Sequence, residues 1–188
     1  MGMIKSVCVF CGSSTGVSEC YSQAAKTLGE VLSQEEIDLV YGGSNVGLMG
    51  IVARTMINHG RHVTGIIPSA LHRIVEPLDI TKLIIVDTMH QRKAAMYERS
   101  DAFIALAGGI GTLEEFMETF TWQQLGYLQK PIALLNTNGY YDLLIKQLEH
   151  NIAAGFMKQA NLDDLIISDD PRELIDAFHS YTYTYRAK

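Results

Sequence analysis

The sequence is short of cysteine and of the patterns that mark disulfide-rich, zinc-binding or redox proteins. It has 3 cysteines in 188 residues, too few for a disulfide framework. Cys8 and Cys11 form one C-x-x-C pair, without the second pair that a structural zinc site would need. Cys8 lies inside the apolar run VCVFC and not at a helix start, where a redox pair would sit. We therefore interpret both as small residues of a strand and its end.

The sequence also lacks a long apolar run, a basic stripe and a metal-binding motif. It has no run of about 18 apolar residues, and MGMIKSVCVF passes straight into a strand-like run without the pattern of a leader. With 15 Lys and Arg spread thinly and a net charge of -6, no face is predicted to follow a nucleic-acid backbone. His59 and His62 lack the acidic partner of a metalloprotease motif. The expectation is a soluble, cytoplasmic protein without a metal, a membrane contact or a nucleic-acid partner.

What the chain does contain is one continuous alternation of strand and helix signals. The strand-like runs are mostly apolar throughout, which is typical of a parallel sheet covered by helices on both faces. The pattern predicts a doubly wound, Rossmann-like α/β fold in a single domain over residues 1–188. The predicted strands are IKSVCVF, IDLVYGG, HVTGIIP, KLIIVD, AFIALAG, PIALLN and a short DLIISDD. The predicted helices span 18–33, a stretch that follows SNVGLMG and stops near Gly60, 89–100, 112–127, 142–154 and a final segment from Pro171 with Asp170 as its cap. The tail YTYTYRAK is predicted to be frayed or to lie along an edge.

Glycine clusters follow three of the predicted strands. In such folds the ligand lies beyond the carboxyl ends of the strands, so CGSSTG (11–16), YGGSNVGLMG (41–50) and AGGIGTLEE (107–115) are the stretches of interest. Glycine between a strand and a helix leaves free N–H groups at the positive end of the helix, which favours an anion. The second cluster lacks the Lys-Ser/Thr of a P-loop, and the third does not complete a dinucleotide fingerprint. An ATPase or a nicotinamide dehydrogenase is therefore disfavoured.

Two adjacent glutamates follow the third glycine cluster. If a helix starts near Thr112, Glu114 and Glu115 lie in its first turn, where the helix dipole lowers a carboxyl pKa, and Glu115 is expected to be ionised at neutral pH. One interpretation is structural: Glu114 and Glu115 only stabilise the start of the helix through its dipole. However, Thr112, Glu115 and Glu118 recur at three-residue spacing and can share one side of the helix. A carboxylate facing a phosphorylated sugar could accept hydrogen bonds from ribose hydroxyls, stabilise positive charge at the anomeric carbon or orient water.

A pair of cations follows the strand KLIIVD. Arg92 and Lys93 lie near the start of a predicted helix, where a cation opposes the helix dipole. Such cations either hold an anion or lie on a solvated face. Arg92 could form a planar fork with phosphate or lie near a departing base.

The stretches YGGSNVGLMG, MHQRKAAM and AGGIGTLEE, in this order, resemble the LOG (Lonely Guy) family of cytokinin-activating phosphoribohydrolases, whose relatives often carry the older label lysine decarboxylase. The resemblance covers nearly the whole chain. It implies hydrolysis of the N-glycosidic bond of cytokinin riboside 5′-monophosphates, and in many members of AMP, without a cofactor or metal. It implies that Arg92 and Glu115 are the catalytic pair. It further implies that the nucleotide site includes Gly42, Gly43, Ser44, Lys93, Gly108, Gly109, Gly111 and Thr112.

The chain departs from the family pattern at Ala107, where the motif usually has proline. Alanine frees φ and restores an N–H donor, which predicts a more flexible loop and lower efficiency rather than lost chemistry. Two alternatives remain open: a general AMP nucleosidase and a nucleotide-binding protein that does not hydrolyse its ligand. Amino-acid decarboxylation would need a pyridoxal-phosphate lysine, for which only Lys93 lies near a candidate anion site.

Two further expectations concern the surface. The aromatic residues of the 112–127 helix lie on more than one of its sides, which predicts that something besides its own sheet covers it. A homodimer is therefore expected, and the resemblance points the same way. Residues 68–82 are a candidate rim for recognition of the base. The aromatic residues concerned are Phe116, Phe120, Trp122 and Tyr127.

Overall fold

The computed structural model describes residues 3–75 and 78–183 and contains one seven-stranded parallel sheet, in the order β4-β3-β2-β1-β5-β6-β7. All seven predicted strands are present, so the predicted parallel α/β fold is confirmed. Their bounds are β1 Ser6–Phe10, β2 Asp38–Tyr41, β3 Val63–Pro68, β4 Lys82–Val86, β5 Ala102–Ala105, β6 Ile132–Leu135 and β7 Ile166–Ser168.

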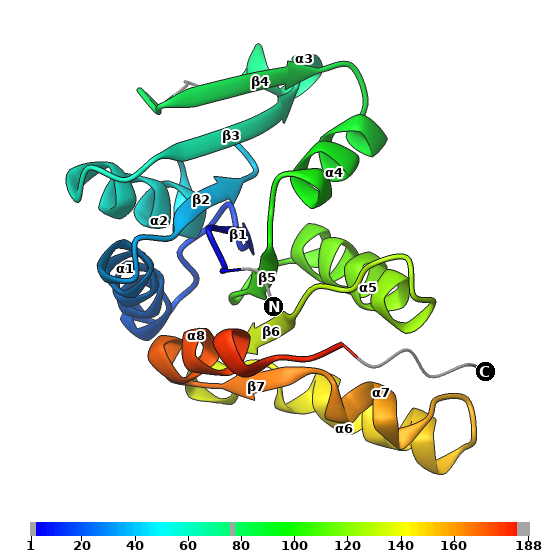
Figure 1. The fold of residues 1–188 in the computed structure, drawn as a ribbon. Helices are drawn as coiled ribbons and strands as arrows, with labels where there is room; N and C mark the ends of the chain where they lie inside the picture. Colours follow the sequence, from blue (N-terminus) through cyan, green and yellow to red (C-terminus); the bar gives the residue numbers. More distant parts are fainter. Residues whose placement is uncertain (1–2, 76–77, 184–188) are drawn as a thin grey trace.

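Helices cover both faces of the sheet (Figure 1). One face packs on α1, α2 and α8, and the other on α4, α5 and α6, and each interface is a continuous apolar core. The bounds are α1 Glu19–Gln34, α2 Gly47–Asn58, α3 Ser69–His72, α4 Met89–Glu98, α5 Ile110–Gln124, α6 Asp142–Ala153, α7 Gln159–Asp163 and α8 Pro171–Ser180, with a short 3-10 helix η1 Thr137–Gly139. Within the described ranges, none of these helices has both the length and the apolar character needed to span a bilayer.

The strand order places the ligand-binding crevice of this fold at β1 and β5. From β1 the chain proceeds to β2 on one side, whereas β5 begins the run to β6 and β7 on the other, so the loops that follow β1 and β5 lie at the point where the strand order reverses. The two loops touch, because the Gly12 N–H donates to the Ala107 carbonyl at 3.0 Å. The glycine clusters of residues 11–16 and 107–115 therefore lie side by side at the carboxyl ends of β1 and β5.

Some helix ends agree with the sequence, but the starts of two helices do not. The helix α2 begins at Gly47, inside the SNVGLMG stretch after which a helix was expected. Ser18 caps α1, and Asp170 caps α8 with Pro171 as its first residue, as predicted. However, α5 begins at Ile110, with Gly109 as its N-cap, and not near Thr112. The first N–H groups of a helix have no intrahelical partner, so glycine there costs little, and the glycines did not delay the helix as the sequence suggested. Residues 184–188 of the tail lie outside the described residues.

Candidate active site

A cavity of about 300 Å³ opens at the carboxyl ends of β1 and β2, between α2, α4 and the start of α5. Five parts of the fold form its walls. The loop after β1 forms one side, the first turns of α5 form another, and single residues of α4, α2 and the loop after β2 complete it. The lining residues are Val9, Cys11, Gly12, Ser13, Gly42, Met49, Arg92, Gly109, Ile110, Gly111, Thr112 and Glu115.

Arg92 and Glu115 meet in this cavity. Arg92 Nη1 donates to Glu115 Oε1 at 2.5 Å, and Arg92 Nε donates to the Ile66 carbonyl at 3.0 Å. Both side chains are largely buried. A capping box fixes the start of α4, in which Thr88 and Gln91 bond to each other's backbone, so Arg92 leaves the first turns of a well-anchored helix. The two residues that the sequence singled out as a pair thus form a buried ion pair.

The pKa of Glu115 differs from the sequence-based expectation. Because α5 starts at Ile110, Glu115 lies in the second turn, beyond the strongest influence of the helix dipole. Burial raises the pKa of Glu115, and the lowering effect of the Arg92 guanidinium does not fully offset it. The expectation of a lowered pKa was therefore wrong. Arg92 is the group that favours the carboxylate form in this cavity.

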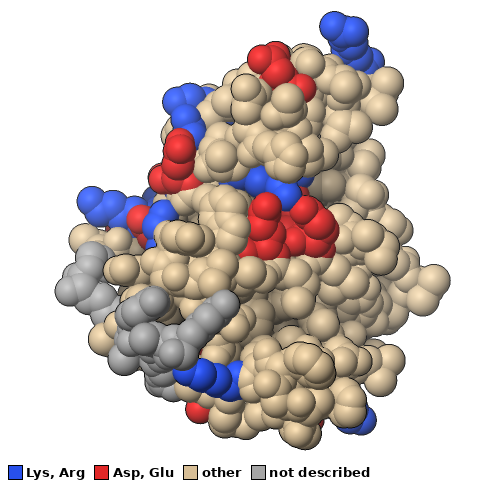
Figure 2. All heavy atoms as spheres, turned by 90° about the vertical axis from the view of Figure 1, so that its right-hand side faces the viewer, with Lys and Arg blue, Asp and Glu red and all other residues tan. Residues whose placement is uncertain are grey.

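Lys93 points away from the cavity toward two other glutamates of α5. Its Nζ lies 2.5 Å from Glu114 Oε1 and 3.0 Å from Glu118 Oε2, and Glu118 also accepts a hydrogen bond from Tyr97. Figure 2 shows acidic and basic side chains gathered side by side near the middle of the face that carries α4 and α5. These ion pairs join the two helices that present Arg92 and Glu115, and Lys93 is not among the residues that line the cavity.

The glycines expected in the site occupy different places. Gly42, Gly109, Gly111 and Thr112 line the cavity, and Gly111 and Thr112 lie in the first turn of α5 rather than in a loop. Gly108 lines a neighbouring cavity, and a Cβ on it would be 2.1 Å from Thr112 Oγ1.

Gly43 and Ser44 follow Gly42 but do not line the cavity. Gly43 has φ +77°, a conformation that favours glycine, and packs against Ile66 and Ile67. Ser44 is buried, and its hydroxyl accepts a hydrogen bond from the Val46 N–H.

Gly42→Ala tests whether the position of the Arg92 guanidinium matters. A Cβ at Gly42 would lie 2.2 Å from Arg92 Nη2 and 3.0 Å from Met49 Sδ, so the guanidinium must move. Because the end of a flexible side chain can shift, the melting temperature is expected to stay within a few degrees. Turnover is expected to fall about 100-fold, as for a displacement of about 1 Å in a reacting site. Wild-type turnover in a folded variant would show that this placement is not critical.

The sequence marked CGSSTG (11–16) as a stretch of interest but assigned none of its residues to the site. Cys11, Gly12 and Ser13 line the cavity beside Arg92 and Glu115, and Met49 of α2 closes it. A second cavity of about 240 Å³ continues past Gly12, Ser13 and Gly109 toward the aromatic rings of Tyr21 and Tyr140. The run CGSSTG directly after a strand was the available signal. Met49 lies inside the marked stretch YGGSNVGLMG without having been singled out, and nothing in the sequence pattern points to Tyr140.

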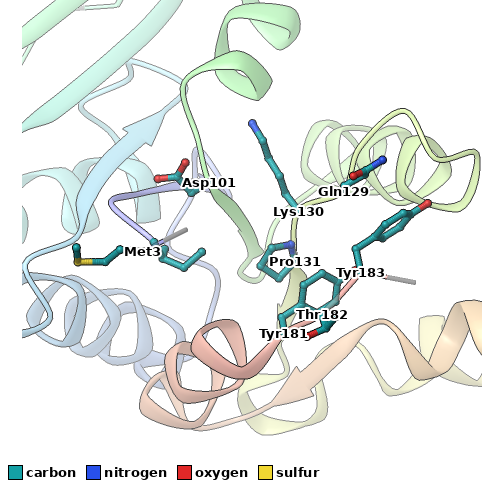
Figure 3. A pocket seen from close by; sticks show the side chains of 9 residues that line it. Met3, Asp101, Gln129, Lys130, Pro131, Tyr181, Thr182 and Tyr183 are labelled. Atoms are coloured by element: carbon teal, nitrogen blue, oxygen red, sulfur yellow. The ribbon is translucent and has the colours of Figure 1, made fainter. Parts of the chain in front are cut away.

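A larger cavity, of about 460 Å³, lies at the opposite ends of the strands, near the starts of β1, β5 and β6 (Figure 3). Its polar side chains bond to this chain: Asp101 accepts hydrogen bonds from the Lys5 and Ser6 N–H groups, and Lys130 donates to the Tyr97 carbonyl. Such bonds are typical of structural groups rather than of groups that converge on a ligand. The parts of the chain that the structure describes hold no group of three or more His, Cys, Asp or Glu arranged for a metal ion.

Comparison with known proteins gives consistent matches over the chain. A family model described as "Possible lysine decarboxylase" matches residues 49–178. The cytokinin riboside 5′-monophosphate phosphoribohydrolases LOG1 and LOG7 of Arabidopsis thaliana are each 44% identical over 178 residues, covering 94% of this chain and 84% and 82% of theirs.

Solved structures with the same fold include proteins that bind or carry the molybdenum cofactor. The molybdenum cofactor binding protein of Rippkaea orientalis has a TM-score of 0.72 and 25% identity, covering 95% of this chain and 98% of its own. The molybdenum cofactor carrier protein of Chlamydomonas reinhardtii has a TM-score of 0.69 and 16% identity over the same shares, a likeness that shows the fold alone.

Proposed function

The chain belongs to the LOG family of cytokinin riboside 5′-monophosphate phosphoribohydrolases, and we propose that the cavity bounded by Arg92, Glu115 and the start of α5 is its active site. The enzyme hydrolyses the N-glycosidic bond of N6-substituted adenosine 5′-monophosphates and releases the free base and ribose 5-phosphate. The observation that carries the proposed site is the buried Arg92–Glu115 pair, which lies in one cavity with the N-terminus of a long helix.

The 5′-phosphate binds at the start of α5 in this proposal. The first N–H groups of α5, at Ile110, Gly111 and Thr112, precede the first intrahelical bond, which the Leu113 N–H makes to the Gly109 carbonyl. They lie at the positive end of the helix dipole, and Cβ atoms at Gly109 and Gly111 would meet nothing within 4 Å, so the backbone is open to a ligand. The Ser13 side of the β1 loop closes the cavity opposite them.

The reacting bond then lies over Glu115 and Arg92. Water adds its oxygen to the anomeric carbon, the C1′–N9 bond breaks with its electron pair going to the base, and the base takes up a proton. We assign Glu115, as a carboxylate, to the ribose hydroxyls and the attacking water, where it stabilises the oxocarbenium-like state. Arg92 holds Glu115 ionised and assists the departing purine or clamps the nucleotide. In the absence of substrate, the ion pair holds the two side chains in place.

The raised pKa of Glu115 predicts how activity depends on pH. Because the carboxylate is the active form, kcat/KM falls as the pH drops through that pKa, and the acid limb is expected above the ordinary glutamate value of about 4.3. The measurement is a kcat/KM profile from acid to neutral pH. The substrate phosphate also titrates, near pH 6. Its titration is therefore measured by phosphorus NMR, and the kcat/KM profile is corrected for it. An acid limb at or below the ordinary glutamate range would contradict the proposed form of Glu115.

The activity test compares two nucleotides. Purified protein, in buffer that contains a metal chelator, is incubated with AMP and, separately, with N6-isopentenyl-AMP. The free base and ribose 5-phosphate are then quantified. We expect equal amounts of both products and faster cleavage of the prenylated nucleotide. Equal rates would indicate a general AMP nucleosidase. Intact nucleotide would indicate a binding protein without hydrolysis.

Decarboxylation is disfavoured by the surroundings of Lys93. A Schiff-base lysine must be able to lose its proton. Burial lowers the pKa of Lys93, but the hydrogen bonds that its ammonium group donates to Glu114 and Glu118 outweigh burial and raise that pKa. Lys93 also lies outside the cavity, and both carboxylates hold its ammonium group in place. This arrangement fits a structural cation rather than a cofactor anchor.

We also propose a homodimer formed through the face of α4 and α5. Phe116 and Phe120 are buried in this chain, and Trp122 packs against Tyr97 with ring centroids 4.9 Å apart, so these three aromatics do not need a second subunit. The fourth aromatic of the predicted 112–127 helix, Tyr127, is 79% exposed. The apolar side chains of α4 and α5 that remain exposed include Ile110, which lines the cavity and is 82% exposed, and Met89 and Met117. Light scattering should then give twice the chain mass of 20.9 kDa, and a single-chain mass would refute the dimer.

A cytoplasmic location completes the proposal. All three cysteines, Cys8, Cys11 and Cys20, are free thiols, which agrees with a reducing compartment.

A further inference from the structure

Three consecutive carbonyl groups before the start of α5 each accept a hydrogen bond from outside their segment. Tyr141 Oη donates to the Leu106 carbonyl at 2.6 Å, the Gly12 N–H donates to the Ala107 carbonyl at 3.0 Å, and Tyr140 Oη donates to the Gly108 carbonyl at 2.5 Å. Two neighbouring tyrosines thus hold the carbonyls on either side of Ala107. The next residue, Gly109, caps the helix that carries the proposed phosphate site.

The turn that presents the two tyrosines is itself fixed. It follows β6, and the Asn136 side chain accepts a hydrogen bond from the Tyr141 N–H at 2.7 Å and donates one to Asp142 Oδ1 at 2.9 Å. Gly139 has φ +69°, and a Cβ there would lie 2.6 Å from Asp142 Oδ2, so the turn needs glycine. Asn136, Gly139 and Asp142 therefore set the direction of both rings.

The two rings differ in burial and share one contact. Tyr141 is 1% exposed, and a buried hydroxyl needs a partner, which the Leu106 carbonyl supplies. Burial also raises the pKa of Tyr141, so its hydroxyl keeps the proton that it donates. Tyr140 is partly exposed and meets Tyr141 edge to face at 5.0 Å and Tyr21 at 5.5 Å. Its ring therefore stays in place even without the hydroxyl.

We propose that Tyr140 and Tyr141 are positioning residues that hold residues 106–108 in the conformation in which the start of α5 binds the 5′-phosphate. This inference rests on the proposed function. A carbonyl oxygen that is held by a hydroxyl cannot turn toward the phosphate, which it would repel. The two hydroxyls thereby supply the restraint that a proline ring would give at Ala107, where alanine leaves φ free. Neither tyrosine acts on the reacting bond.

The test separates phosphate binding from catalysis. Tyr140→Phe removes one hydroxyl and keeps the ring, so we expect the Kd for ribose 5-phosphate and the KM for the nucleotide to rise about tenfold, while kcat changes less than about threefold. The Kd for adenosine, which has no phosphate, should not change. Tyr127→Phe makes the same chemical change at an exposed tyrosine beyond α5 and is the matched control. A lower kcat with unchanged KM, or equal weakening of adenosine, would overturn the proposal.

A second variant distinguishes a restraint on the loop from direct contact with the ligand. Ala107→Pro restricts φ, and in the Tyr140→Phe background it is expected to restore most of the lost affinity for ribose 5-phosphate. The single variant Ala107→Pro should bind ribose 5-phosphate at least as tightly as the unchanged chain. No recovery, or a loss in the single variant, would overturn the inference. If the unchanged chain neither binds ribose 5-phosphate nor cleaves nucleotide, the proposed function fails instead.

Discussion

Glu115→Gln is expected to lower kcat about 100- to 10,000-fold while the nucleotide still binds. Glutamine keeps the shape of the side chain and can still accept a hydrogen bond from Arg92 Nη1, which lies 2.5 Å from Glu115 Oε1 in the unchanged chain. It has no negative charge with which to stabilise an oxocarbenium-like state or to activate water. Single-turnover kinetics with N6-isopentenyl-AMP, together with a calorimetric Kd, separate the two effects.

Glu98→Gln provides the control for this substitution. Glu98 lies at the end of α4, and its side chain is 75% exposed and paired only loosely with Arg99, at 3.7 Å. The same chemical change there should leave kcat unaltered. Near wild-type turnover in Glu115→Gln would remove Glu115 from the mechanism, whereas equal loss of turnover in both variants would point to a general effect of charge.

Arg92→Lys should also lower activity, although it preserves the charge. The Arg92 guanidinium donates at once to the Ile66 carbonyl through Nε and to Glu115 through Nη1. A lysine ammonium on a flexible stem cannot reproduce two bonds in fixed directions. Losing a hydrogen bond to a charged group costs about 1.5–3 kcal/mol, so kcat/KM should fall roughly 10- to 100-fold. The acid limb of the pH profile should also move, because the cation that favours ionised Glu115 is displaced.

Arg99→Lys is the matched control for Arg92→Lys. Arg99 follows the last turn of the same helix, is partly exposed, and donates to the Ala95 carbonyl at 3.1 Å. Its replacement should alter neither kcat/KM nor the pH profile. If Arg92→Lys retained full activity with an unmoved acid limb, the planar fork would be unnecessary, and a simple positive charge would suffice at this position.

Local patterns were sufficient for the architecture. Alternation of apolar runs with amphipathic stretches is written into consecutive residues, so the order of strands and helices could be predicted, as could caps such as Ser18 and Asp170. The start of α5 was missed by two residues, because glycine is read as a breaker although the first turn of a helix tolerates it. That small error had a consequence, since it placed Glu115 two residues too near the positive end of the helix dipole.

The features of the candidate site also fall into those that local sequence predicts and those that depend on the tertiary structure. From the sequence came the glycine clusters at the strand ends, the candidates Arg92 and Glu115, and the resemblance that joined them. The structure supplied the contact between those two side chains, 23 residues apart, and the pairing of Lys93 with Glu114 and Glu118.

The structure alone also decided the raised pKa of Glu115 and the bond from Tyr140 to the Gly108 carbonyl, 32 residues away. The physical reason is distance. Hydrophobic period and turn chemistry depend on neighbours in the chain, whereas desolvation, ion pairing and hydrogen bonding depend on atoms that only folding brings together. The sequence by itself thus determined the elements and the family of this protein, and the tertiary structure decided which charges and hydroxyls act on one another.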